Sequence, residues 1–206
     1  MHVKRQTISK LWKIPKKGTK YLIVPSHNKN EGLPLLMILR DILKIAKNRK
    51  EARSILLQGL VSVNRKVRKR ENFSVLPFEI ISINGKNYEV IFSDKGKLEV
   101  QETKRDEMPL KVIDKKMLKH KKIQLNLIYG KTILSNEKVK TGDSVVIKEN
   151  KIVKVIPMEE GKEIIIFSGK YKGISGKLEK LEGEIAKINA GKEKINVPIK
   201  NIMVVK

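Results

Sequence analysis

The chain has 206 residues, no cysteine, and 46 Lys and Arg residues against 22 Asp and Glu, so its formal net charge is +24. This length fits one or two ordinary domains or several small ones, and the 40% hydrophobic content argues against wholesale disorder. The lack of cysteine excludes a disulfide scaffold, a Cys-based zinc finger and a catalytic thiol, and it fits a reducing compartment. No apolar run approaches the ~20 residues of a spanning helix, and no signal peptide is expected.

The positive charge predicts a polyanionic partner, for which nucleic acid, an anionic membrane and an acidic protein are the candidates. Subtracting the net +3 of residues 158–206 from +24 leaves +21 in the first 157 residues, so the binding face should lie mostly there. Only nine residues are aromatic, fewer than a protein that stacks successive single-stranded bases usually carries. Structured RNA or a DNA duplex, bound through its phosphates, therefore fits better.

Residues 2–30 are a basic segment with eight Lys or Arg residues and no acid. Pro15, Gly18 and Pro25 interrupt any helical period. The segment is therefore predicted to be an extended arm that docks through Trp12 and Tyr21. The alternative is a loose, solvated tail.

Residues 33–59 have the pattern of two consecutive helices. Pro34 suits a first helical position, and apolar residues then recur at helical spacing. Asn48 is placed to N-cap the second helix, with Glu51 three residues later as in a capping box, and Gly59 is placed to end it. The basic residues on the outer face of the second helix are Arg49, Lys50 and Arg53.

Short strands are predicted for most of the remaining chain. After the second helix, residues 60–63 and a return strand from residue 67 flank a basic turn, and residues 78–83 end at Asn84-Gly85. In the central part, the predicted strands are residues 88–92, 98–101, 123–128, 144–148 and 152–156. In the terminal part, residues 163–167, 185–188, 194–197 and 202–205 are predicted to form a small barrel. The stretch 111–122 between two of these strands is expected to be a helix or a loop, and its exposed cations are Lys115, Lys116, Lys119, Lys121 and Lys122.

Catalysis finds little support in the sequence. The three histidines are scattered, with no pair at metal-ligand spacing. Gly130-Lys131-Thr132 resembles the end of a phosphate-binding loop, but that loop needs a glycine at the position that Leu125 occupies. No pair of acids stands in an apolar run as a tuned general acid would. The chain is therefore expected not to be an enzyme, and to bind no metal, cofactor or small-molecule substrate.

The segment from residue 39 to residue 64 resembles the small RNA-binding domain named after ribosomal small-subunit protein four, which consists of two helices followed by a short sheet. The matching positions are Arg49, Ala52, Gly59, Val63 and Asn64. In that family the second helix and the following turn contact RNA, which by position implies Arg49, Lys50, Arg53, Asn64, Arg65 and Lys66. The family often has Asn-Gly at this turn. Since a type I′ turn would hold Arg65 at a costly positive φ, the turn is expected to be of another type.

Three glycines, Gly169, Gly173 and Gly176, follow the strand 163–167 at spacings of four and three, a pattern typical of tight turns. This segment resembles a KOW motif, which occurs in small SH3-like barrels of ribosomal and transcription-elongation proteins. The alternative is a generic glycine-rich hairpin.

The order of these parts resembles the archaeal and eukaryotic small-subunit ribosomal protein family S-four-e over essentially the whole chain. Further matching segments are residues 2–5 with Trp12, 33–36, 139–144 and 201–205. The end at Lys206, without the extra basic tail of eukaryotic members, suggests an archaeal source.

This resemblance implies an α+β, mostly β fold. Its parts are a basic arm (1–30), a ribosomal-protein-four-type RNA-binding domain (31–85), an all-β central domain (86–157) and a KOW SH3-like domain (158–206). The implied function is a cytoplasmic, ribosome-bound structural constituent of the small subunit, which binds ribosomal RNA beside neighbouring ribosomal proteins and has no membrane partner. The alternatives are a KOW-containing RNA-binding factor in transcription elongation or RNA processing, and an RNA-modifying enzyme with the same RNA-binding domain.

The candidate RNA-binding residues fall in four groups along the chain. The arm contributes Lys4, Arg5, Lys10, Trp12, Lys13, Lys16 and Lys17. The RNA-binding domain contributes Arg49, Lys50, Arg53, Asn64, Arg65, Lys66 and Arg68. The central and terminal parts contribute Lys115, Lys116, Lys119, Lys121, Lys122, Lys170 and Lys172.

Overall fold

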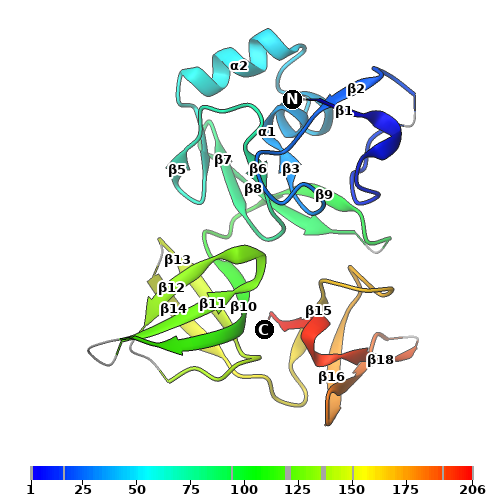
Figure 1. The fold of residues 1–206 in the computed structure, drawn as a ribbon, viewed down its shortest axis with the longest axis vertical. Helices are drawn as coiled ribbons and strands as arrows, with labels where there is room; N and C mark the ends of the chain where they lie inside the picture. Colours follow the sequence, from blue (N-terminus) through cyan, green and yellow to red (C-terminus); the bar gives the residue numbers. More distant parts are fainter. Residues whose placement is uncertain are drawn as a thin grey trace. The chain divides into compact units, whose positions relative to one another are not determined.

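A computed structural model describes residues 2–15, 17–93, 95–118, 122–135, 138–149, 151–191 and 193–205. The chain divides into two compact units, residues 1–93 with 97–106 and residues 94–96 with 107–206 (Figure 1). Strands dominate both units, and the two α-helices of the described residues belong to the first, which confirms the mostly β class. Within these residues, no helix is both long enough and apolar enough to span a membrane.

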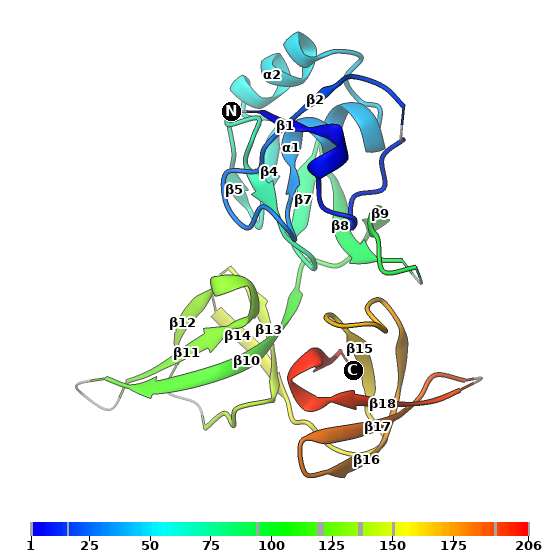
Figure 2. The same cartoon turned by 45° about the vertical axis from the view of Figure 1, so that its right-hand side comes forward.

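The first unit combines two short α-helices with a five-stranded antiparallel sheet of order β5-β4-β7-β8-β9. Two smaller pairings complete it, β1 with β2 (Figure 2) and β3 with β6. Its elements are β1 (His2–Lys4), β2 (Tyr21–Ile23), β3 (Leu33–Pro34), α1 (Leu35–Met37), a π-helical turn (Ile38–Ile42), α2 (Arg49–Leu57), β4 (Val61–Val63), β5 (Lys66–Val67), β6 (Ser74–Val75), β7 (Ile80–Ile83), β8 (Lys86–Phe92) and β9 (Leu98–Thr103).

The helix α2 begins and ends where the sequence predicts. The Glu51 backbone N–H donates to the Asn48 side-chain oxygen at 2.9 Å, which is the expected N-cap. Gly59 takes a φ of +78° and closes the helix by donating to Leu56 O at 3.1 Å. The first helical segment is shorter than its periodicity suggests, because the π-helical turn ends at Ile42 and Lys44 leaves helical geometry with a φ of +55°.

The main sheet of the first unit runs across residue 85, where the sequence predicts a domain boundary. Asn84 and Gly85 both have positive φ, +48° and +81°, and form the tight turn that joins β7 to β8. The strand β8 in turn pairs with β9 in an antiparallel hairpin. Residues 86–103, expected in the central domain, therefore complete the sheet of the first unit.

The arm is folded rather than extended. Its strands β1 and β2 pair in register His2↔Ile23 and close a loop between them. Trp12 is 4% exposed, and its indole N–H donates to Gly32 O at 3.1 Å. Tyr21 does not dock as predicted, since it is 52% exposed while its neighbour Leu22 is buried. Strand alternation explains the swap, because adjacent residues of β2 face opposite sides.

The second unit contains two five-stranded antiparallel sheets, of orders β12-β11-β10-β13-β14 and β18-β17-β16-β15-β19. The strands of the first sheet are β10 (Met108–Met117), β11 (Ile123–Leu127), β12 (Thr132–Ser135), β13 (Ser144–Lys148) and β14 (Lys151–Ile156). Those of the second sheet are β15 (Glu163–Ile166), β16 (Ser175–Glu182), β17 (Ile185–Asn189), β18 (Lys194–Pro198) and β19 (Ile202–Val204). Single 3₁₀ turns lie at Arg5–Thr7 in the first unit and at Ile128–Gly130 and Ile199–Asn201 in the second.

The two sheets of the second unit share one buried core. Val146 and Ile156 of the first sheet lie in the same hydrophobic cluster as Ile164 and Val204 of the second. The Val204 backbone N–H also donates to the buried Ser144 hydroxyl at 3.0 Å. These contacts hold the sheets together across the boundary predicted near residue 157.

Two of the three predicted turn glycines, Gly169 and Gly173, have a φ near +90°. The third, Gly176, has an ordinary φ and is required for a different reason. A Cβ at Gly176 would lie 2.5 Å from the Asn189 carbonyl oxygen of the paired strand β17. Only a residue without a side chain fits this close backbone approach.

We expect Gly176→Ala to lower the free energy of unfolding of the second unit by about 1–3 kcal/mol, because the methyl group forces β16 away from β17. Urea unfolding followed by circular dichroism measures this loss. Gly183→Asn is the control, since its site is open and asparagine tolerates the φ of +59° there. Equal stability of the two variants would contradict the packing role of Gly176.

The second unit also buries a charged side chain, that of Lys111 on β10, which is 4% exposed. Its ammonium donates to Ile199 O, at the start of the 3₁₀ turn before β19. Burial away from water disfavours the charged form and lowers the pKa of Lys111 to about 8.

This lowered pKa predicts a pH dependence of stability. Between the folded pKa of about 8 and the unfolded value of about 10.4, the unfolded chain holds a proton that the folded chain has lost. The free energy of unfolding should therefore rise as pH increases through this window. Urea unfolding of the protein and of Lys111→Met across this range isolates the effect. We expect the rise in the parent to exceed that in Lys111→Met, and parallel curves would contradict the assignment.

Candidate RNA-binding surface

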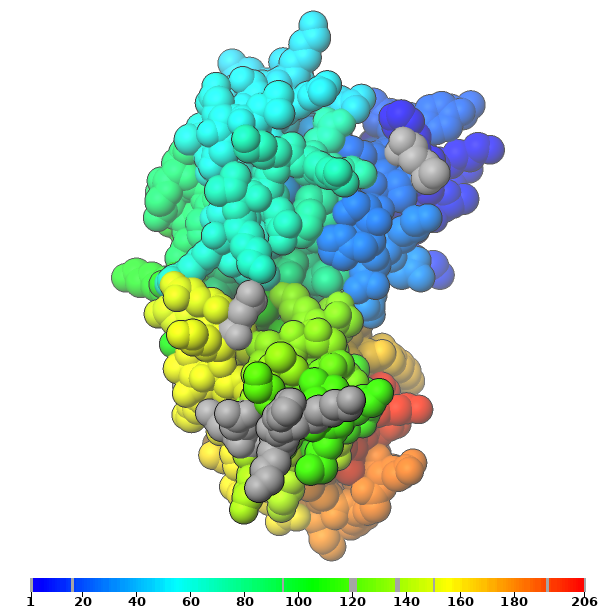
Figure 3. All heavy atoms as spheres, turned by 60° about the vertical axis from the view of Figure 1, so that its left-hand side comes forward, coloured from blue at the N-terminus to red at the C-terminus, as the bar shows by residue number. Residues whose placement is uncertain are grey.

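The second helix presents its cations on an open surface of the first unit. Ala52 and Leu56 form the buried side of α2, so the opposite side of the helix faces outward (Figure 3, cyan). Lys50 and Arg53 lie on this exposed side, and neither is hydrogen-bonded to a residue that the structure describes. Both are therefore available to phosphate groups, as the sequence predicts for the face of this helix.

Arg49, in contrast, is held by the protein itself. Its Nε donates to Glu71 Oε2 at 2.9 Å, and its Nη2 donates to Glu71 Oε1. The hydrogen bonds from Arg49 hold the pKa of Glu71 below its usual range. The sequence could not reveal this pairing, because Glu71 lies 22 residues further along the chain. Arg49 can meet an RNA phosphate only by sharing or leaving its carboxylate.

The turn that follows β4 is a two-residue hairpin with positive φ at both positions, +48° at Asn64 and +64° at Arg65. This is the sign pattern of a type I′ turn, so the expectation of another turn type is wrong. The Asn64 side chain stabilises the strained geometry, since it donates to Glu79 Oε1 at 2.9 Å and accepts from the Ile80 N–H at 3.1 Å. Asn64 is therefore a structural residue whose side chain is already engaged.

Two further cations near this turn contact the protein in different ways. Arg65 donates to Asp106 Oδ2 at 2.9 Å, which partly neutralises it. Arg68 stacks on Phe73, with its guanidinium carbon 4.3 Å from the ring centroid, and Phe73 meets His27 edge to face at 5.1 Å. Lys66 is exposed at the turn. Lys69 and Arg70 beyond it are exposed too, although they are not among the RNA-binding candidates predicted from sequence.

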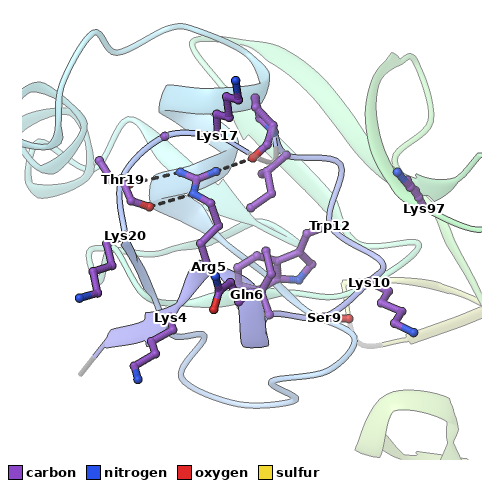
Figure 4. A pocket seen from close by; sticks show the side chains of 14 residues that line it. Lys4, Arg5, Gln6, Ser9, Lys10, Trp12, Lys17, Thr19, Lys20 and Lys97 are labelled. Carbon is purple, nitrogen blue, oxygen red and sulfur yellow. Dashed lines mark hydrogen bonds between the residues drawn. The ribbon is translucent and has the colours of Figure 1, made fainter.

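In the arm, the predicted cations divide into structural and exposed groups. Arg5 donates to Thr19 O at 2.8 Å and to Pro15 O at 2.6 Å, so it braces the loop (Figure 4). Lys13 forms an ion pair with Glu99 of β9 at 2.6 Å. Of the other predicted arm lysines, Lys4 on β1 and Lys10 and Lys17 in the loop are exposed. Lys16 lies outside the described residues.

Two of the five central lysines, Lys115 and Lys116, lie on a strand rather than on the predicted helix or loop. The residues up to Met117 belong to β10, which pairs with β11 in a long hairpin (Figures 1 and 2). Lys115 and Lys116 are consecutive on this strand and so face opposite sides of it. Lys122 is exposed before β11, and Lys119 and Lys121 lie outside the described residues.

The terminal pair lies in the turn after β15. Lys170 is exposed and sits 5.4 Å from the centroid of the Tyr171 ring. Lys172 is half-buried. This pair belongs to the second unit, whereas the α2 group belongs to the first.

The chain is similar to known proteins of one family. The chain matches the S4 domain over residues 33–81 and Ribosomal family S4e over residues 84–152. The small ribosomal subunit protein eS4 of Archaeoglobus fulgidus is 35% identical over 181 residues, which cover 84% of this chain and 77% of that protein. The protein of the same name from Methanocaldococcus jannaschii is 36% identical over 189 residues, with 84% and 78% covered.

A solved structure agrees with these matches. The crystal structure of the 30S ribosomal protein S4e from Thermoplasma acidophilum covers 86% of this chain with a TM-score of 0.72, at 28% identity and over 96% of that chain. The chain belongs to the S4e family of ribosomal proteins. Membership of this structural, non-enzymatic family confirms the expectation that the chain is not an enzyme, and the archaeal relatives agree with the suggested archaeal source.

Proposed function

We propose that this protein is a structural constituent of the small ribosomal subunit, cytoplasmic and ribosome-bound, which binds ribosomal RNA beside neighbouring ribosomal proteins. The observation that carries the proposal is the exposed cationic face of α2 and its following turn, in a chain of the S4e family. Lys50, Arg53 and Lys66 would neutralise phosphates there, and the arm lysines would add further contacts. Several such contacts would hold RNA helices in a fixed relation during assembly and translation.

We further propose that residues 158–206 are a KOW-type SH3-like module. The five strands β15 to β19 and the turn glycines Gly169 and Gly173 support this reading. The shared core with the first sheet of the second unit indicates that the module acts as part of a larger body rather than as a free RNA-binding arm.

Co-sedimentation tests the ribosomal role. We expect the tagged protein to remain with small subunits through a high-salt wash, because release from an assembled particle requires all of its contacts to break together, although salt weakens each phosphate contact. A KOW-containing factor that cycles on and off would leave the subunits in the wash. Recovery only in the supernatant would therefore favour that alternative.

Charge reversal tests the RNA-binding face. Lys50→Glu with Arg53→Glu should leave the fold nearly intact, since exposed changes usually move stability by within ~0.5 kcal/mol. Binding to small-subunit ribosomal RNA should weaken by about tenfold or more, because two cations near phosphate become anions. Arg49 is left unchanged, because a glutamate at position 49 would place its carboxylate against that of Glu71 and the two would repel each other.

The matched control is Lys177→Glu with Lys200→Glu, two exposed lysines of the second unit. It makes the same change in net charge on the module that carries only +3. We expect this control to lose less affinity for ribosomal RNA than Lys50→Glu with Arg53→Glu, with both affinities measured by filter binding. Equal losses in the two double variants would mean that net charge alone governs binding and that the proposed face is wrong.

A further inference from the structure

The arm loop between β1 and β2 borders an open hollow of about 930 Å³. Its inner wall carries the apolar side chains of Ile8, Trp12, Ile14 and Pro15. Phosphate contacts alone do not need such a wall, because a helical backbone would touch only the outer lysines. Its size lies within the range of cavities that hold small ligands.

The guanidinium of Arg5 crosses the hollow and is fixed there by three hydrogen bonds (Figure 4). They run to Thr19 O at 2.8 Å, Pro15 O at 2.6 Å and Thr19 Oγ1 at 3.3 Å. Gly18 allows the chain to pass against this group, since a Cβ there would lie 2.7 Å from Arg5 Nη2. The loop is therefore built around a flat cation that the loop's own oxygen atoms hold by hydrogen bonds.

Lysines surround the hollow, and none of its lining residues that the structure describes is acidic. In Figure 4 the side chains of Lys4, Lys10, Lys17 and Lys20 extend outward from the centre, where Arg5 and Trp12 lie. These rim residues are Lys4, Lys10, Lys17, Lys20 and Lys97. Lys20 and Lys97 are absent from the candidates predicted from sequence, because nothing local shows that the 97th residue meets the arm.

An apolar wall with a fixed guanidinium inside and ammonium groups outside matches one ligand class better than others. A nucleotide has a flat base that stacks on aromatic or guanidinium planes, and a phosphate on either side. A fully paired helix would leave the apolar wall unused. An acidic peptide would satisfy the lysines but offers no flat ring for the wall.

We propose that the hollow holds an unpaired, unstacked nucleotide of RNA, with its base against the apolar wall and its neighbouring phosphates on the rim lysines. The proposal rests on the proposed RNA-binding function and deepens it. It assigns the arm a base-binding pocket, distinct from the phosphate-binding face of α2.

Trp12 is the one tryptophan of the chain and lines the hollow, so its fluorescence reports directly on the site. The probes are two RNA hairpins of equal phosphate count, one with a loop of about five adenosines and one with abasic loop positions. We expect the adenosine hairpin to quench Trp12 and to bind roughly tenfold more tightly than the abasic one, as befits one stacked base. Equal affinities with unchanged Trp12 emission would overturn the pocket while leaving RNA binding intact. Failure to bind either hairpin or ribosomal RNA would instead overturn the proposed function.

Two variants separate the wall from the rim. Ile14→Phe fills the hollow without changing charge, so it should abolish the preference for the adenosine loop and leave the abasic affinity within about twofold. Lys17→Gln should weaken both hairpins more than Lys29→Gln, an exposed arm lysine outside the lining. An unchanged Trp12 emission spectrum in each free variant shows that the arm is still docked. Retention of the preference in Ile14→Phe, or quenching by polyglutamate but not by RNA, would overturn the proposal.

Discussion

The affinity of this protein for small-subunit ribosomal RNA should fall steeply as the salt concentration rises. Each lysine or arginine that neutralises a phosphate releases a condensed counterion, so log K against log[salt] should slope by about −0.7 to −0.9 per contact. If about six to ten phosphates are contacted, the dissociation constant should rise by roughly 10³ to 10⁵ between about 50 and 200 mM salt. Filter binding across this range measures the slope.

The structure indicates which cations are free to contact phosphates and therefore contribute to this slope. Arg49, Arg65 and Lys13 are already paired with carboxylates, so they contribute less than their charge suggests. The exposed cations of α2, the following turn and the arm rim are the main contributors. A slope near zero would contradict a binding mode based on phosphates, whatever the affinity at low salt.

Trp12→Ala should lower the free energy of unfolding of the first unit by about 3–5 kcal/mol, which is the usual cost of truncating a buried tryptophan. Trp12 is 4% exposed and bridges the arm to two distant segments, at Gly32 and beside Leu98 of β9. Urea unfolding followed by circular dichroism measures the loss.

The control for this prediction is Tyr21→Ala, whose side chain is 52% exposed on the same arm. It should change stability by within ~0.5 kcal/mol. A loss for Trp12→Ala as small as this would mean that the arm is the loose tail considered from the sequence. For the same reason, deletion of residues 2–30 should destabilise the first unit.

The parts of the fold that follow from sequence are those with short-range signals. The cap at Asn48, the stop at Gly59 and the turn at Asn84-Gly85 each depend on a few adjacent residues, and the structure confirms all three. Four strands of the terminal part, β15, β17, β18 and β19, were predictable for the same reason, because turn residues separate short apolar runs. The strand β16 was missed, because it begins at Ser175 within the glycine-rich segment that was assigned to tight turns.

The parts of the fold that could not be predicted from sequence depend on contacts between residues far apart in the chain. The arm folds because Arg5 bonds Pro15 and Thr19, and because Leu98 N–H donates to Leu11 O at 2.7 Å. Arg65 adopts positive φ in a hairpin that is pinned through Asn64. The strand β10 was not apparent because its lysines break the alternation of apolar and polar residues.

The candidate site shows the same division. Composition and the position of the second helix correctly place cations on an exposed face, since charged residues seldom lie buried. Which of them are free is a tertiary property, as the pairing of Arg49 with Glu71 shows. The hollow in the arm is harder to predict from sequence, because it is formed by residues of β1, of the loop that follows β1 and of a hairpin distant in the chain.

Protein–RNA crosslinking on intact small subunits, with the crosslinked peptides mapped, tests the RNA-binding face most directly. We expect crosslinks to ribosomal RNA from the arm, residues 2–30, and from α2 and its turn, residues 49–70. Crosslinks confined to residues 158–205, or none from a protein that sediments with the subunit, would contradict the assignment of the RNA-binding face to the first unit.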